Sequence, residues 1–170
     1  MSNELNRFLD LYGTVVAATN DWIKATPPEV LDWIPDEGPG NLFTDARGKL
    51  SIRLFYVHLV SSDHKQAPQL WSCDEGATIV PSDRELADKL MASDDLVGDA
   101  ARLHEQDMAD FGKITDTQME KTVLRGDHQW TIAGYLWSIY SHRAFHVGNM
   151  DIYLRERHVV PPNYYPAIMR

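Results

Sequence analysis

Apolar residues recur at steps of three and four over residues 5–23, which predicts an amphipathic helix with one face toward a core. The stripe consists of Leu5, Phe8, Leu9, Tyr12, Val15, Val16, Thr19, Trp22 and Ile23. Pro27 and Pro28 predict that this helix ends near Ala25. The segment from Thr26 to Glu29 reads as a capping box with proline in the first turn, and it predicts a short helical turn as far as Trp33.

The middle of the chain predicts two further helical regions between polar connections. Residues 35–49 are rich in Pro, Gly, Asp and Asn, which predicts a loop. A second helix is expected from about Lys49 to Gln66 or Trp71. After a connection over residues 72–82, a capping box at 82–85 predicts a third helical region that continues to Phe111. A break or kink is expected in it at Gly98 and the acidic cluster of Asp94, Asp95 and Asp99.

The last helix is expected from about Trp130 to Arg157, because Pro161 and Pro162 prevent a longer run. Residues 112–129 are polar, with a helical turn predicted at 117–121 and a turn at Gly126. The aromatic tail over residues 163–170 is expected to pack against the body. Because no strand-like alternation is sustained, the predicted fold class is all-α: a four-helix bundle with long connections, in a single domain over residues 1–170.

Charge and cysteine content narrow the classes of function. The chain has 16 Lys and Arg against 25 Asp and Glu, a net charge of -9, and this argues against nucleic acid or an anionic membrane surface as a partner. No apolar run is long enough to cross a bilayer. The single Cys73 excludes an intrachain disulfide, and the first residues lack an apolar signal core. We therefore expect a cytoplasmic protein.

Two histidines in the last helix are the strongest chemical signal. His142 and His146 are four residues apart, which places both imidazoles on one helix face, one turn apart. The same stripe contains Tyr135, Ile139 and Tyr153, so it is expected to face the bundle interior. Burying imidazoles costs free energy unless they gain partners, and a metal ion is such a partner. Nitrogen ligands favour zinc, nickel, copper or iron over magnesium or calcium.

His58 is the candidate for a third ligand, because it lies among apolar residues in the middle of the second predicted helix. Three histidines with an open position are typical of a catalytic metal site rather than a closed structural one. The other histidines are not expected to be ligands: His64 and His104 are interpreted as solvated, His128 as part of a loop, and His158 as a helix-end residue.

Several alternatives stay open at this point. Ser62, Asp63 and His64 are candidates for a fourth ligand that would close the site, although none has an obviously right spacing. Tyr135, Tyr153 and Asn149 could orient a substrate but are at least as simply explained by packing. No general base or other catalytic residue can be identified, and Cys73 lacks any neighbouring residue that marks a reactive thiol.

Two stretches resemble the DinB/YfiT-like family of metalloenzymes. Residues 48–60 around His58 are similar to that family's second helix, with its single ligand histidine. Residues 141–155 resemble its final-helix pattern, with histidines at His142 and His146, and are followed by the proline pair. Asn149 stands where the family usually has glutamine. The segment from Pro27 to Trp33 also resembles the family's turn after the first helix.

The resemblance implies a four-helix bundle, frequently a homodimer, that holds a metal with His58, His142 and His146. Zinc or nickel is expected first, with iron or manganese as alternatives. The leading hypothesis is a metal-dependent enzyme acting on a small-molecule substrate. Some relatives are transferases or isomerases that use a low-molecular-weight thiol, and this version is slightly favoured over a hydrolytic one because no general base is identified. The second hypothesis is a non-catalytic, metal-binding dimer associated with stress.

Overall fold

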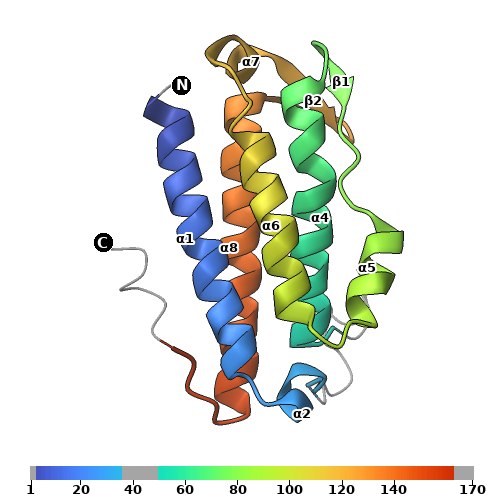
Figure 1. Cartoon of the computed structure of the whole chain (residues 1–170), viewed down its shortest axis with the longest axis vertical. Coiled ribbons are helices and arrows are strands. Elements are labelled where there is room, and N and C mark those ends of the chain that lie inside the picture. Colours follow the sequence, from blue (N-terminus) through green and yellow to red (C-terminus); the bar gives the residue numbers. More distant parts are fainter. Residues whose placement is uncertain (1–2, 36–49, 163–170) are drawn as a thin grey trace.

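Four long helices form the body of the molecule. The computed structural model describes residues 3–35 and 50–162. The long helices are α1 (Asn3–Ala25), α4 (Ile52–Ser72), α6 (Leu96–Phe111) and α8 (Ile132–Glu156). In Figure 1 they stand side by side, which confirms the predicted all-α four-helix bundle.

The direction of the helices sets which residues can meet. In Figure 1, α1 and α8 run from the upper end to the lower end, whereas α4 and α6 run the opposite way. Helix α8 packs against both α1 and α4, and α6 packs against the same two helices from the other side. Because α4 and α8 are antiparallel neighbours, the first half of α4 lies beside the second half of α8.

Polar side chains at the first positions determine where these helices begin. Ser51, Asp95 and Thr131 each accept a hydrogen bond from the backbone N–H three residues later. The two predicted capping boxes are wrong in detail. Asp83, not Ser82, caps the helix α5 (Arg84–Met91), and the Thr26 hydroxyl donates to the Trp22 carbonyl instead of capping α2 (Pro28–Leu31).

The third predicted helical region is in fact two helices, α5 and α6. The break falls at residues 92–95 and includes Asp94 and Asp95 of the predicted segment, because the Asp95 side chain accepts from the Gly98 N–H and so starts a new helix. Figure 1 shows α5 on the outside of the bundle, next to α4 and α6. The acidic segment between the two helices therefore acts as a helix start as well as a break.

The expectation that the chain forms no strands is wrong. Strands β1 (Ala77–Thr78), β2 (Thr122–Arg125) and β3 (His128–Thr131) form a sheet in the order β1-β2-β3. The predicted turn at Gly126 is confirmed: this residue has a φ of 57° and joins β2 to β3 as an antiparallel hairpin. Strands of two and four residues are too short for their alternation to register in sequence. Trp130 consequently belongs to β3, and α8 begins two residues later.

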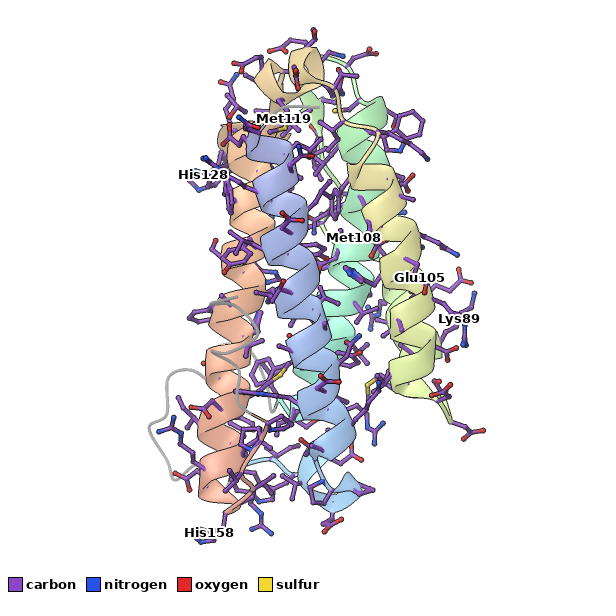
Figure 2. The ribbon with its side chains drawn as sticks, turned by 60° about the vertical axis from the view of Figure 1, so that its left-hand side comes forward. Lys89, Glu105, Met108, Met119, His128 and His158 are labelled. Carbon is purple, nitrogen blue, oxygen red and sulfur yellow. The ribbon has the colours of Figure 1, made fainter. Side chains whose placement is uncertain are left out.

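The sheet and the short helix α7 (Asp116–Glu120) cover one end of the bundle (Figure 1). In Figure 2, Met119 and His128 lie at that end and His158 lies at the other. Met108 projects from α6 toward α1, where a Cβ added to Gly13 would lie 3.6 Å from its Cε atom. A Cβ at position 13 would therefore make only an ordinary van der Waals contact with Met108.

The apolar core consists of two clusters. One contains the first half of α1 together with Leu70, Phe111 and Ile139, and the other contains the end of α1 together with Phe55, Leu96 and Met150. Residues 61–63 of α4 and Arg143 of α8 are buried but belong to neither cluster. A polar layer thus separates the two apolar halves of the core.

Two predictions concern segments that the structure does not describe. The loop predicted over residues 35–49 lies outside the described residues except for Pro35, and the packed tail at 163–170 lies outside them entirely. Within the described ranges, no helix is both long enough and apolar enough to span a membrane.

Phe8→Ala should lower the free energy of unfolding by about 3 to 5 kcal/mol, because it removes a buried ring from the core. The Phe8 ring stacks on Tyr12 and meets Phe111 and Trp137 edge to face. Urea unfolding followed by circular dichroism measures the loss. Val160→Ala is the control, since Val160 is 91% exposed and should change stability by less than about 0.5 kcal/mol. Equal stability of the two variants would contradict the assigned core.

Candidate metal centre

Helix α8 supplies two of the three predicted ligands. His142 and His146 lie one turn apart on it, as the spacing predicts. His146 is buried, His142 is half-buried, and their rings lie 4.7 Å apart between centroids. The predicted inward-facing stripe is confirmed, because Tyr135, Ile139 and Tyr153 are all buried as well.

Helix α4 supplies the third predicted ligand, His58. His58 lies in its second turn and is exposed, although the residues on either side of it are buried. Because α4 and α8 run in opposite directions, this early position in α4 lies beside the later positions in α8. The structure therefore brings His58, His142 and His146 together from positions 84 and 88 residues apart.

The three imidazoles converge through the same ring atom. His142 Nε2 lies 3.1 Å from His58 Nε2 and 3.1 Å from His146 Nε2. One ligand atom from each residue can be chosen so that all three lie within 4.8 Å of one another. The ring planes meet at 80–86°, so the rings are edge to face and none is stacked on another.

This geometry suits a bound cation. In a tetrahedral zinc site with Zn–N bonds of about 2.0–2.1 Å, two nitrogen ligands lie about 3.3 Å apart. An imidazole nitrogen carries either one proton or one lone pair, so hydrogen bonding cannot satisfy both 3.1 Å contacts of His142 equally. A cation in contact with all three lone pairs would satisfy them together, and the residues present therefore fit a divalent metal.

The surroundings of the cluster are aromatic on the protein side and open at His58. The buried Phe55 ring lies 5.2 Å from the His146 ring, and the Phe145 ring lies 5.4 Å from it. Phe145 itself is 57% exposed. A ligand cluster with one buried and one exposed member can be reached by a small molecule from the His58 side.

The candidates for a closing fourth ligand are engaged elsewhere. The Ser62 hydroxyl donates to the Pro81 carbonyl, and Asp63 accepts from Arg143 and Tyr12. His64 pairs with Asp107. In the part of the chain that the structure describes, no cysteine or carboxylate joins the three histidines. Tyr135 and Tyr153 belong to the two apolar clusters, which supports the packing interpretation of both.

The remaining histidines differ from the sequence interpretation in three cases. His104 is half-buried, with its Nδ1 atom inside the protein, and His64 forms an ion pair, so neither is simply solvated. Polar neighbours in sequence had suggested exposure. However, His64 lies on α4 and His104 lies on α6, and these two helices pack against each other. His128 lies in β3 rather than in a loop. His158 is exposed at the end of α8, as expected.

Sequence reasoning missed the buried ion pair next to the cluster. Arg143 follows His142 directly, and its Nη2 lies 2.6 Å from Asp63 Oδ2 on α4. The Arg143 Nε also donates to this oxygen, and so does the Tyr12 hydroxyl of α1, at 2.7 Å. The available signal was a charged residue directly between the two histidines of a mostly apolar helix face, but that face was defined without Arg143.

Burial and pairing shift the pKa values in this layer. Burial raises the pKa of Tyr12 well above its usual range, and the neighbouring Asp63 carboxylate adds to the shift. Burial by itself lowers the pKa of Arg143, but Asp63 outweighs it, and the guanidinium stays charged. Burial raises the pKa of Asp107 to about 6. For His104, burial and then the charge of Arg143 lower the pKa to about 4.

One solved structure shares this architecture across nearly the whole chain. YfiT from Bacillus subtilis, described as a probable metal-dependent hydrolase with an unusual four-helix bundle topology, aligns with a TM-score of 0.61. The alignment covers 94% of this chain and 91% of that one, at 17% sequence identity. The likeness establishes a YfiT-type bundle and thus confirms the predicted resemblance at the level of the fold. No protein-family model and no curated protein matches the sequence.

The lowered pKa of the half-buried His104 predicts a specific loss of stability in acid. Its folded pKa of about 4 lies below the ordinary 6.5, so the folded state binds fewer protons than the unfolded state. The stabilisation is complete above pH 6.5 and is lost as the pH falls toward 4. Between pH 7 and 4.5, the wild type should lose roughly 2 kcal/mol more than His104→Gln, measured by urea unfolding with a chelator present. Parallel pH curves for the two proteins would contradict the assignment.

Proposed function

We propose that this protein is a metal-dependent enzyme that acts on a small molecule, with His58, His142 and His146 as the metal ligands. The convergence of the three Nε2 atoms, with His142 3.1 Å from each of the others, is the observation that carries the proposal. Three neutral imidazoles favour zinc or nickel, with iron or manganese as alternatives. Because they leave the full charge of a divalent ion uncompensated, they suit a Lewis-acid role.

A divalent ion at this position would polarise a substrate oxygen or lower the pKa of a water or a thiol toward neutrality. The residues of the chain have separate tasks. His146 is held from the protein side by Phe55, whereas His58 is exposed and defines the side from which a substrate arrives. Phe145 next to His146 offers an exposed apolar surface for part of that substrate.

Hydrolysis is the first reaction class that we propose, because the structural neighbour YfiT is described as a probable metal-dependent hydrolase. Thiol transfer or isomerisation with a low-molecular-weight thiol is the second. The absence of a carboxylate from the described ligand cluster favours it, since a coordinated thiol loses its proton without a separate base. The two classes use the same three histidines and differ in the nucleophile.

We also propose that the chain forms a single domain, that it assembles as a homodimer and that it is located in the cytoplasm. The non-catalytic alternative, a metal-stabilised binding protein, would need only the three ligands and no reaction on the open side. The open His58 side and the lack of a fourth side-chain ligand among the described residues favour an enzyme.

After reconstitution with zinc or nickel and removal of excess metal, we expect elemental analysis to find one metal ion per chain. His142→Ala and His146→Ala should each weaken metal binding by at least about tenfold, because each removes a direct ligand. His58→Ala should do the same. The matched control is His128→Ala, since His128 is exposed on β3, far from the site. A metal-free wild type, or full retention of metal by all three ligand variants, would overturn the proposed site.

Two parallel assays on the reconstituted protein distinguish hydrolysis from thiol transfer. A panel of activated esters and amides tests hydrolysis, and monochlorobimane with mycothiol, bacillithiol or glutathione tests thiol transfer. We expect turnover in one assay that requires the metal and that His146→Ala abolishes. If metal raises the melting temperature but neither assay shows metal-dependent turnover, the non-catalytic role is supported instead.

A further inference from the structure

A buried ion pair links the two helices that carry the metal ligands. Asp63 and Arg143 are 1% and 2% exposed, and they connect α4 to α8 through two N–H donors of Arg143 on Asp63 Oδ2. Each partner is close in sequence to a ligand: Asp63 follows His58 by five residues, and Arg143 lies between His142 and His146. The pair is thus built into the same helical turns as the proposed metal site.

Apolar packing alone does not fix how far α8 is displaced along α4. Contacts between aliphatic and aromatic side chains are non-directional, so neighbouring registers can bury similar areas. A shift of one residue moves a helical side chain about 1.5 Å along the axis and turns it by about 100°. Such a shift would carry Arg143 out of the interface and leave Asp63 as a buried, unpaired carboxylate, which is strongly unfavourable.

A third helix restrains the pair in turn. The Tyr12 hydroxyl of α1 donates to the same Asp63 oxygen, and the Arg143 guanidinium lies 5.7 Å from the centre of the Tyr12 ring. The three hydrogen bonds to Asp63 Oδ2 therefore form together only when α1, α4 and α8 are in one relative register. Specifying register is the best-attested role of buried polar groups.

We infer that the Asp63–Arg143 pair, held by Tyr12, positions α4 against α8 so that His58 meets His142 and His146. The inference rests on the proposed metal site. In this role Asp63 and Arg143 are positioning residues, since they act on the site through the helices that carry its ligands. The 3.1 Å distance between His142 Nε2 and His58 Nε2 is the quantity that the register controls, because it crosses from α8 to α4.

If Arg143 influenced the metal site only through its charge, one substitution would have the opposite effect on metal binding. Arg143 is a buried cation beside the ligands and would repel a divalent ion. If charge were its only influence, Arg143→Met would tighten metal binding. If the pair sets the register, Arg143→Met weakens binding because His58 is no longer held opposite α8. The sign of the change therefore separates the two roles.

The test measures zinc affinity by competition with a chromophoric chelator, together with the visible spectrum of the cobalt-substituted protein. Arg143→Met should weaken zinc binding by about tenfold or more and alter the cobalt spectrum. The double variant Asp63→Leu with Arg143→Met replaces the pair by apolar side chains, and such replacements are often neutral or stabilising. We expect it to fold stably and still bind zinc about tenfold more weakly.

The matched control is Asp107→Asn. Asp107 is also a buried acid in an ion pair, but its partner His64 links α4 to α6 rather than to α8. This variant should change stability without changing zinc affinity or the cobalt spectrum. Zinc binding as tight as in the wild type in the stable double variant, or tighter binding in Arg143→Met, would overturn the inference. Failure of the wild type to bind zinc would instead refute the proposed metal site.

Discussion

The contact between α4 and α8 is the constraint on which the proposed site depends. Neither helix holds three ligands: α8 provides His142 and His146 one turn apart, and α4 provides only His58. The third imidazole reaches the other two because the helices are antiparallel and in one particular register. The proposed metal centre is therefore a property of the interface between two helices, and whatever fixes that interface also fixes the distance from the His58 nitrogen to those of α8.

The polar layer between the two apolar clusters has the same consequence for the whole bundle. Asp63, Arg143 and Tyr12 give up hydration, and their hydrogen bonds at Asp63 Oδ2 offset part of this cost only in the register that brings them together. The apolar clusters on either side provide most of the burial but little directional information. Stability and register thus come from different parts of the core. The YfiT-type topology persists at 17% sequence identity to its structural neighbour, which is consistent with apolar packing that many sequences can supply.

The overall acidity of the chain does not extend to the proposed ligand set. The net charge is -9, but the described cluster consists of three histidines and contains no carboxylate. Asp63, an acid on the same helix as His58, is paired with Arg143. A divalent ion at this place would keep most of its charge for a substrate. The half-buried His104 and the buried Asp107 lie near this layer with pKa values of about 4 and about 6, because burial lowers the pKa of the imidazole and raises that of the carboxyl.

The sequence by itself determined the long helices, their approximate ends and the histidine pair of α8, because helical periodicity, proline positions and an i,i+4 spacing are local properties. It also indicated His58, through its apolar neighbours and the resemblance around it. The three short strands were missed because two to four residues carry no readable alternation. The burial of Arg143, its pairing with Asp63 and the meeting of His58 with His142 were decided only by the tertiary structure. Those facts depend on which helix faces lie opposite one another, and no local pattern in a single chain specifies how two distant helices are set side by side.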